Sequence, residues 1–223
     1  ESPTVGAVAA VRSAPVGDYK DLETLREFAR GKDVITFDHE HVPTEFLHTL
    51  IAEGVNVQPH PDALQYAQDK LMMRQAVEDL GLPNPRWARV ETLDELLAFG
   101  DEIGWPVVLK TPRGGYDGKG VMVLDSLQHA REQAAAWFDE LPHCTDFSAL
   151  LAEEKVPFTR ELSALVARRE SGQVLPWPVV ETIQVNSVCD EVIAPAPNLS
   201  PAIAQAASDA AVTLATELGV TGV

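Results

Sequence analysis

The chain has 223 residues, of which 45% are apolar and 23% charged, as is ordinary for a soluble globular protein of one or two domains. Its 34 acidic residues outnumber its 17 basic residues, and a formal net charge of −17 repels nucleic acid and anionic lipid, so neither is an expected partner. Two cysteines are too few for a disulfide framework or a metal cluster, and neither a signal peptide nor a membrane-spanning apolar run is visible. We therefore expect a cytoplasmic protein.

The two ends of the chain look like interrupted elements. The chain begins in a loop-like ESPTVGAV without an initiator Met, and it ends on LGVTGV, which resembles the start of a strand. We expect a fragment that is truncated at both ends.

The first third of the chain alternates predicted helices with short apolar strands. Helices are predicted over residues 18–30 and from Pro43 to Gly54, and strands over residues 33–37 and 55–57. This alternation predicts a parallel sheet covered on both faces, with ligands beyond the carboxyl ends of its strands. The expected apolar face of the first helix consists of Leu22, Leu25, Phe28 and Ala29.

The segment Asp38-His39-Glu40-His41 follows the first of these strands directly. Two histidines and two acids within four residues allow a metal site, although catalytic zinc sites usually gather their ligands from separate elements. In a second interpretation Glu40 contacts a polar substrate at the edge of the sheet. In a third the segment is a solvated loop.

An amphipathic helix is predicted from Asp69 to Leu80. Lys70 and Arg74 lie one turn apart on it, either as a phosphate-facing pair or as part of a solvated surface. The expected apolar face consists of Leu71, Met72, Gln75, Ala76 and Leu80.

Three later helices carry boundary signals. Thr92 begins a capping box, and Asp125 or Ser126 caps a helix that runs through Phe138. The last helix has Ser200 at its N-cap and ends before Gly219, with Pro at its first position.

The most informative stretch, WPVVLKTPRGGYDGKGVMVL, begins at Trp105 and consists of two apolar, β-favouring runs around a loop with four glycines. Glycine lets backbone N–H groups turn inward, which suits a phosphate cradle. Lys110 ends the first strand, and Arg113 and Lys119 lie in the loop, so this stretch predicts an anion site. Its spacing matches neither the P-loop nor the dinucleotide fingerprint. A flexible hairpin with solvated charges is the alternative.

A second informative segment, LLAEEKVPFTRELSALVAR, begins at Leu150. An apolar strand runs into an acidic bend at residues 153–156, and another strand begins at Glu161 and is expected to pair with residues 176–184. Such a bend suits an adenine site, because its backbone groups can bond the base edge while an acid holds the ribose hydroxyls. An acidic surface turn is the alternative.

Together these segments resemble the ATP-grasp superfamily, and within it the N5-carboxyaminoimidazole ribonucleotide synthases of purine biosynthesis. The matching motifs are TFDHEHVP, QDKLMMR, GLPNPRW, VVLKTPRGGYDGKGV, EEKVPFTRELS, PVVETIQ and ELGVTGV. The resemblance implies a mixed α/β and α+β architecture, in which an N-terminal Rossmann-like pre-ATP-grasp domain (residues 1–73) precedes an ATP-grasp domain (residues 74–223) with a lid subdomain at about 90–152.

The resemblance also implies a reaction. In that family ATP, bicarbonate and 5-aminoimidazole ribonucleotide give N5-carboxyaminoimidazole ribonucleotide, ADP and phosphate, through phosphorylation of bicarbonate to carboxyphosphate. An ATP-dependent carbon–nitrogen ligase with ATP and Mg²⁺ as cofactors is therefore implied, as is a homodimer. The alternatives are a formate-dependent transformylase, a biotin carboxylase relative, or a non-catalytic nucleotide-binding module.

Site residues are implied position by position. Lys110 matches the lysine that contacts ATP phosphate, Glu40 matches an acid near the amino-imidazole end of the substrate, and Gln184 falls where some relatives have His. The magnesium ligands and the basic residues for the ribonucleotide phosphate are expected beyond Val223, so no metal ligand is assigned within the chain. The residues implied to bind ATP are Lys70, Lys110, Gly115, Tyr116, Asp117, Gly118, Lys119, Gly120, Val121, Glu153, Glu154, Lys155, Val156, Glu161 and Gln184. Those implied to contact the substrate are Glu40, Tyr116 and Asp117, and those implied in catalysis are Tyr116, Asp117 and Lys119.

Overall fold

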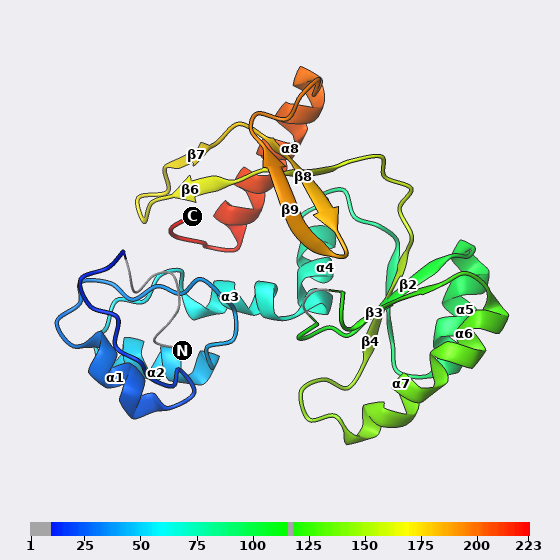
Figure 1. Cartoon of the computed structure of the whole chain (residues 1–223), viewed down its shortest axis with the longest axis horizontal. Helices are drawn as coiled ribbons and strands as arrows, with labels where there is room; N and C mark the ends of the chain where they lie inside the picture. Colours follow the sequence, from blue (N-terminus) through cyan, green and yellow to red (C-terminus); the bar gives the residue numbers. More distant parts are fainter. Residues whose placement is uncertain (1–9, 116–117) are drawn as a thin grey trace.

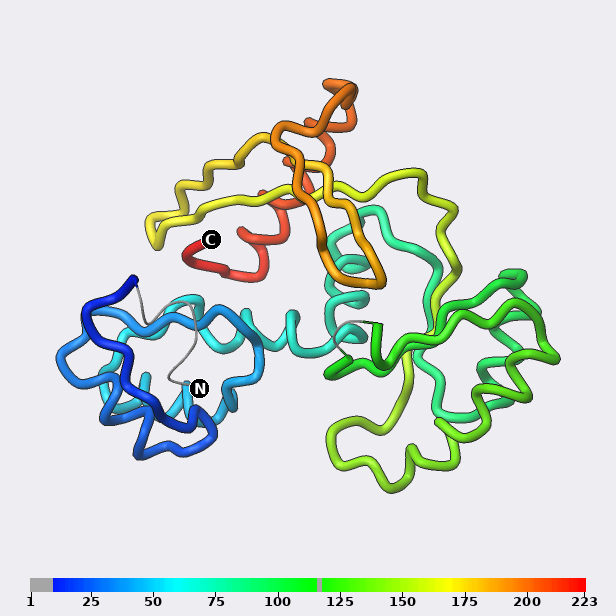
Figure 2. Tube along the Cα trace, viewed as in Figure 1, coloured from blue at the N-terminus to red at the C-terminus, as the bar shows by residue number. Residues whose placement is uncertain are grey.

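The structure, a computed structural model, describes residues 10–115 and 118–223. Figure 1 shows three lobes: α1–α3 at the N-terminus, β1–β4 with α5–α7 in the middle of the chain, and β5–β9 with α8 at the end. The trace in Figure 2 shows α4 (Lys70–Asp79) leading from the first lobe to the junction of the other two. Within the described residues, no helix is long and apolar enough to cross a membrane.

The first lobe contains α1 (Leu22–Ala29), α2 (Thr44–Ala52) and α3 (Pro61–Gln68). In place of the two predicted strands, the structure has a single parallel bridge between Ile35 and Val57. The predicted parallel pairing is confirmed, but the predicted strand lengths were wrong. Pro59, which has no N–H to donate, follows the bridge by two residues and cannot extend the ladder.

The helices of this lobe differ from the sequence analysis in two ways. Phe28, predicted to lie on the buried face of α1, is 45% exposed, whereas Leu25 and Ala29 of this two-turn helix join the described core of the lobe. Helix α3, which was not predicted, begins with Pro61 at its first position and His60 as its N-cap.

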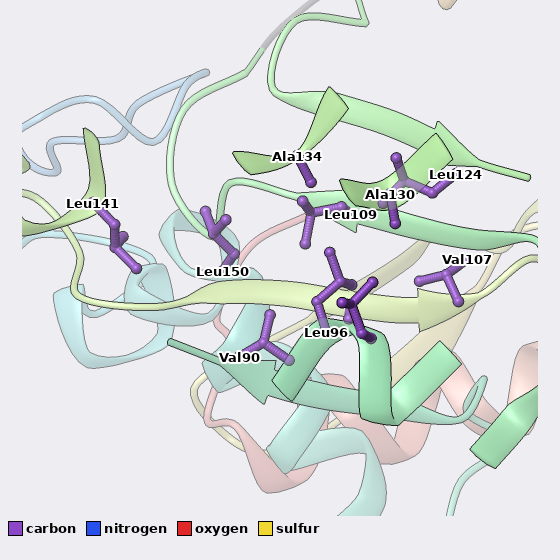
Figure 3. Close-up of a cluster of buried hydrophobic side chains, with 11 residues drawn as sticks. Val90, Leu96, Val107, Leu109, Leu124, Ala130, Ala134, Leu141 and Leu150 are labelled. Carbon is purple, nitrogen blue, oxygen red and sulfur yellow. The ribbon is translucent and has the colours of Figure 1, made fainter. Parts of the chain in front are cut away.

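The middle lobe is an antiparallel sheet in the order β1-β4-β2-β3. Its strands are β1 (Trp87–Val90), β2 (Val107–Lys110), β3 (Val121–Leu124) and β4 (Leu150–Glu154). One face packs against α5 (Leu93–Ile103) and α6 (Leu127–Gln133), and Figure 3 shows Leu96, Leu109 and Leu124 in the resulting core. The predicted strand–loop–strand is confirmed, and so is the capping box at Thr92.

The predicted helix after β3 is capped by Ser126, but it divides at Ala134 into α6 and α7 (Ala135–Glu140), and a 3₁₀ turn (Leu141–His143) follows. Side chains alternate between the two faces of the sheet along β2, and this alternation positions Lys110. Val107 and Leu109 point into the core, so Val108 and Lys110 lie on the opposite face of the sheet.

The third lobe holds a sheet in the order β5-β8-β9 and a separate pair of strands, β6 and β7. Their bounds are β5 (Glu161–Ser163), β6 (Val166–Arg168), β7 (Val174–Pro176), β8 (Val180–Val185) and β9 (Val188–Ile193). The predicted pairing after the acidic bend is confirmed as β5 with β8, whereas β9 was not predicted.

Helix α8 (Pro201–Glu217) has the predicted Ser200 cap, and Gly219 follows with a φ of +67°. Ile203, predicted to line its apolar face, is 53% exposed, and Ala215 is buried instead. The same kind of shift occurs on α4, where Val77 is buried and Gln75 exposed.

Candidate functional site

A hydrogen bond joins the two ends of the glycine loop between β2 and β3. The N–H of Thr111 donates to the carbonyl of Gly120 at 2.9 Å, directly beyond the β2–β3 ladder. Gly115 and Gly120 have φ values of +81° and +72°, and a Cβ at Gly120 would lie 2.4 Å from Thr111 Oγ1. A Cβ at Gly115 would lie 2.4 Å from the carbonyl oxygen of Lys119, so both positions require glycine on steric grounds.

The first part of this loop is fastened to the N-terminus of α4. The backbone N–H of Lys70 donates to the carbonyl of Pro112 at 2.9 Å, and its Nζ donates to the carbonyl of Gly114 at 2.9 Å. Asp69 accepts from backbone N–H groups in the first turn of α4, and its Oδ2 lies 3.1 Å from Nε of Arg113. These contacts hold the predicted cation Lys70 against the loop.

Several of the predicted site residues surround Lys70, among them Lys110, Glu40 and Glu153. Burial lowers the pKa of its ammonium group, and the positive charge of Lys110 lowers this pKa further. The charges of Glu40, Asp69 and Glu153 act in the opposite direction, so all three acids lie near Lys70. Two neighbouring ammonium groups, one of them partly desolvated, form a site that a polyanion would stabilise.

Glu153, on the antiparallel neighbour strand β4, forms an ion pair with Lys110 on β2. Glu153 is 3% exposed, and it is the buried charged residue within the described part of the chain. One carboxylate oxygen lies 2.5 Å from Nζ of Lys110, and the other pairs with Nε of Arg74 on α4. Asn84 accepts from Nη1 of Arg74 at 3.1 Å and orients the guanidinium. The buried carboxylate thus has two cationic partners, as burial requires.

Strand β4 continues through Glu154, so the chain leaves the sheet only at Lys155 and not at Glu153, where the acidic bend was predicted to begin. Glu154 accepts from the backbone N–H and from Nε of Arg86, both at 3.0 Å, and these bonds lower the pKa of its carboxyl group. Lys155 and Val156 are exposed where the chain leaves the sheet. Because the side chains of Glu153 and Glu154 are engaged in ion pairs, a base at this bend would bond to backbone groups.

The third lobe brings its β8–β9 turn against the glycine loop (Figure 1). Glu161 on β5 lies opposite Thr182, and Gln184 is exposed on the same β8 strand, close to the turn. The side chain of Ser187 in that turn lies within van der Waals distance of the space above Gly118. Lys119 and Val121 are exposed on the loop.

Two of the predicted site residues, Tyr116 and Asp117, lie outside the described residues. In the ranges that are described, no group of three His, Cys, Asp or Glu side chains is arranged to hold a metal ion. The described residues therefore do not form a magnesium site by themselves. His39 packs against the rings of Tyr19 and His41, at centroid distances of 5.0 and 5.3 Å.

Sequence reasoning missed several residues that build the site. The spacing left Arg74 as a phosphate-facing or solvated cation, yet it binds Glu153. A signal for this pair was present, since a carboxylate in an otherwise apolar strand needs a buried cationic partner. Ser187 and the Asp69–Arg113 pair offered no comparable signal, because these contacts join segments that are distant in the chain. Thr111 contacts Gly120 across the loop, which the spacing alone did not show.

Comparison with known protein families gives two matches. The model of the ATP-grasp domain matches residues 75–223, and the model of the ribonucleotide synthetase preATP-grasp domain matches residues 2–68. A curated relative, the N5-carboxyaminoimidazole ribonucleotide synthase of Mycobacterium tuberculosis, is 49% identical over 208 residues. That match covers 93% of this chain and 47% of the relative, so the chain spans about half the length of the curated relatives it matches.

Solved structures agree with these matches. The ADP complex of an N5-carboxyaminoimidazole ribonucleotide synthetase has a TM-score of 0.81 and 32% identity, over 92% of this chain and 52% of that chain. The Aspergillus clavatus N5-carboxyaminoimidazole synthase, in complex with ADP and 5-aminoimidazole ribonucleotide, has a TM-score of 0.80 and 29% identity, over 97% and 54%. The predicted fold class and resemblance are confirmed, and the chain belongs to the ATP-grasp family.

Proposed function

We propose that the protein containing this chain is an ATP-dependent carbon–nitrogen ligase that carboxylates 5-aminoimidazole ribonucleotide with bicarbonate. The products are N5-carboxyaminoimidazole ribonucleotide, ADP and phosphate, in purine biosynthesis. The names of the relatives support this reaction, as do the nucleotide and ribonucleotide bound in a solved relative.

One observation carries the proposal: the carbonyl of Glu40, in the first lobe, accepts from Nε2 of Gln68 at 2.8 Å, two residues before the Lys70 that bonds the glycine loop of another lobe. An acid that orients the substrate amine must stand close to the transferred phosphoryl, because the amine attacks the phosphorylated bicarbonate there. A general nucleotide-binding module would need the two lysines and the loop, but it would not need this acid.

The proposed chemistry has two balanced steps. A bicarbonate oxygen attacks the γ-phosphorus, the bond from phosphorus to the bridging oxygen breaks, and ADP leaves. The substrate amine then attacks the carboxyl carbon of carboxyphosphate, the bond from that carbon to the phosphate oxygen breaks, and phosphate leaves with the electron pair and takes up the proton that the amine loses. Lys70 and Lys110 would offset the charge of the transferring phosphoryl, and the glycine loop would shield the intermediate from water.

We propose ATP-contact roles for the residues of the loop, the acidic bend, Glu161 and Gln184. Tyr116, Asp117 and Lys119 are proposed to act in catalysis at the loop. Magnesium, when bound, would neutralise part of the phosphate charge. We also propose a division into residues 1–73 and 74–223 with a lid at about 90–152, and these bounds lie close to those of the three lobes. A homodimer in the cytoplasm is also proposed, and light scattering on the whole protein would test the dimer.

The decisive experiment measures ADP release by the whole protein with ATP and one acceptor system at a time. We expect release with 5-aminoimidazole ribonucleotide plus bicarbonate, and none with formate or with biotin in its place. Omitting bicarbonate while keeping the ribonucleotide is the matched control. Equal release with biotin or formate would replace the proposal by another ATP-grasp ligase. If no acceptor stimulates ADP release, a non-catalytic nucleotide-binding module remains.

A further inference from the structure

The tip of the β8–β9 hairpin touches the glycine loop at one point. An ideal Cβ built on Gly118 would lie 2.8 Å from Oγ of Ser187 and 3.1 Å from its Cβ. Gly118 belongs to the loop of the middle lobe, whereas Ser187 belongs to the turn of the third lobe. The hydroxymethyl group of Ser187 therefore occupies the space directly above the backbone of Gly118.

The turn itself places this side chain at a conformational cost. Asn186 and Ser187 have φ values of +51° and +66° and join the paired residues Val185 and Val188. A two-residue turn with both φ values positive is the type I′ turn, for which Asn-Gly is the preferred pair. Ser at the second position has a Cβ that this backbone conformation disfavours. Glycine would make the turn more stable but would leave the space above Gly118 empty.

We propose that Ser187 is a positioning residue that seats the glycine loop. Its side chain contacts the loop at Gly118 and holds the amides of the loop over the ATP phosphates, so that loop placement depends on the third lobe. This inference rests on the proposed function only in treating the loop as a phosphate-binding element. In this proposal the β8–β9 turn positions the loop through the contact of Ser187 with Gly118 and does not itself bind ATP.

Gly114 offers a matched control within the same loop. Its φ of +66° is close to the +78° of Gly118, but a Cβ at Gly114 would meet nothing within 4 Å. An alanine at either position carries the strain of a positive φ. Only the alanine at Gly118 also collides with Ser187, so the difference between the two variants measures the contact.

The test uses the whole protein and measures the Kd of ATP by calorimetry, together with Tm. We expect Ser187→Gly to keep or raise Tm, because glycine suits the turn, and to raise the Kd about threefold or more. Gly118→Ala should raise the Kd about tenfold more than Gly114→Ala. Adding Ser187→Gly to Gly118→Ala should recover at least about threefold of that loss, because the clash is gone.

Two results would overturn the inference. One is an unchanged Kd in Ser187→Gly, and the other is strict additivity of Gly118→Ala and Ser187→Gly. In the first case, a lower Tm of Ser187→Gly would assign Ser187 to stability alone. ATP binding is measured without bicarbonate or ribonucleotide, so a failure of the proposed carboxylation leaves this test intact.

Discussion

Glu153→Gln is the substitution for which the structure predicts the largest energetic effect. The change keeps the size of the side chain but removes the charge that lies between Lys110 and Arg74. Breaking a buried ion pair costs about 3–5 kcal/mol, because the remaining charges stay desolvated. About a quarter of each cationic side chain is exposed, which offsets part of this cost. We therefore expect a loss of about 3 kcal/mol in the free energy of unfolding.

The neighbouring residue supplies a matched control for this prediction. Glu154 also pairs with an arginine, Arg86, but its side chain is 32% exposed, against 4% for that of Glu153. Glu154→Gln should therefore lower the free energy of unfolding much less than Glu153→Gln. Urea unfolding of the two variants and the parent, followed by tryptophan fluorescence, measures the difference. Equal losses of unfolding free energy in the two variants would refute the argument that the burial of Glu153 makes its ion pair with Lys110 strongly stabilising.

Three further predictions concern charges at the site. Lys110→Ala should weaken ATP binding by about 1.5–3 kcal/mol, because a charge-assisted contact is lost, and an unchanged Kd by calorimetry would contradict its proposed role. ATP should raise the lowered pKa of Lys70, so binding just below pH 10.5 should take up protons; calorimetry in buffers of different ionisation enthalpy measures this, and Lys70→Met should remove the uptake. The carboxyl pKa of Glu154 is lowered, so its contribution to stability is present above its ordinary pKa of 4.5 and is lost as the pH falls through the lower folded value. Glu154→Gln should accordingly flatten the acid side of the stability–pH profile, and identical profiles below pH 4.5 would count against the Arg86 contact.

Local sequence signals predicted the elements that depend on neighbours along the chain. The capping box at Thr92, the Ser200 cap and the strand–loop–strand around Lys110 are all confirmed. Alternation along β2 also determines that Lys110 lies off the core face, since Val107 and Leu109 are buried. These features follow from hydrogen bonds and side-chain periods that span a few residues, so no knowledge of the fold is needed.

Burial faces were predicted less well, because a helical period does not show what packs against a helix. Phe28 and Ile203 belong to apolar stripes that extend beyond the surface the rest of the fold covers. The strands predicted at 33–37 and 55–57 were apolar enough, but only one parallel bridge forms between them. In each case the extent of contact is a property of the neighbouring element.

Only the tertiary structure joined residues that lie far apart in the chain. The strand order β1-β4-β2-β3 sets Glu153 beside Lys110, and the packing of α4 adds Arg74 to the pair. Glu40 approaches Lys70 from another lobe, and the β8–β9 turn meets the glycine loop at Gly118. The chain by itself determined which residues carry charge and where the backbone bends. Their convergence required the fold, because a contact between distant segments is set by strand pairing and lobe packing, which no local pattern encodes.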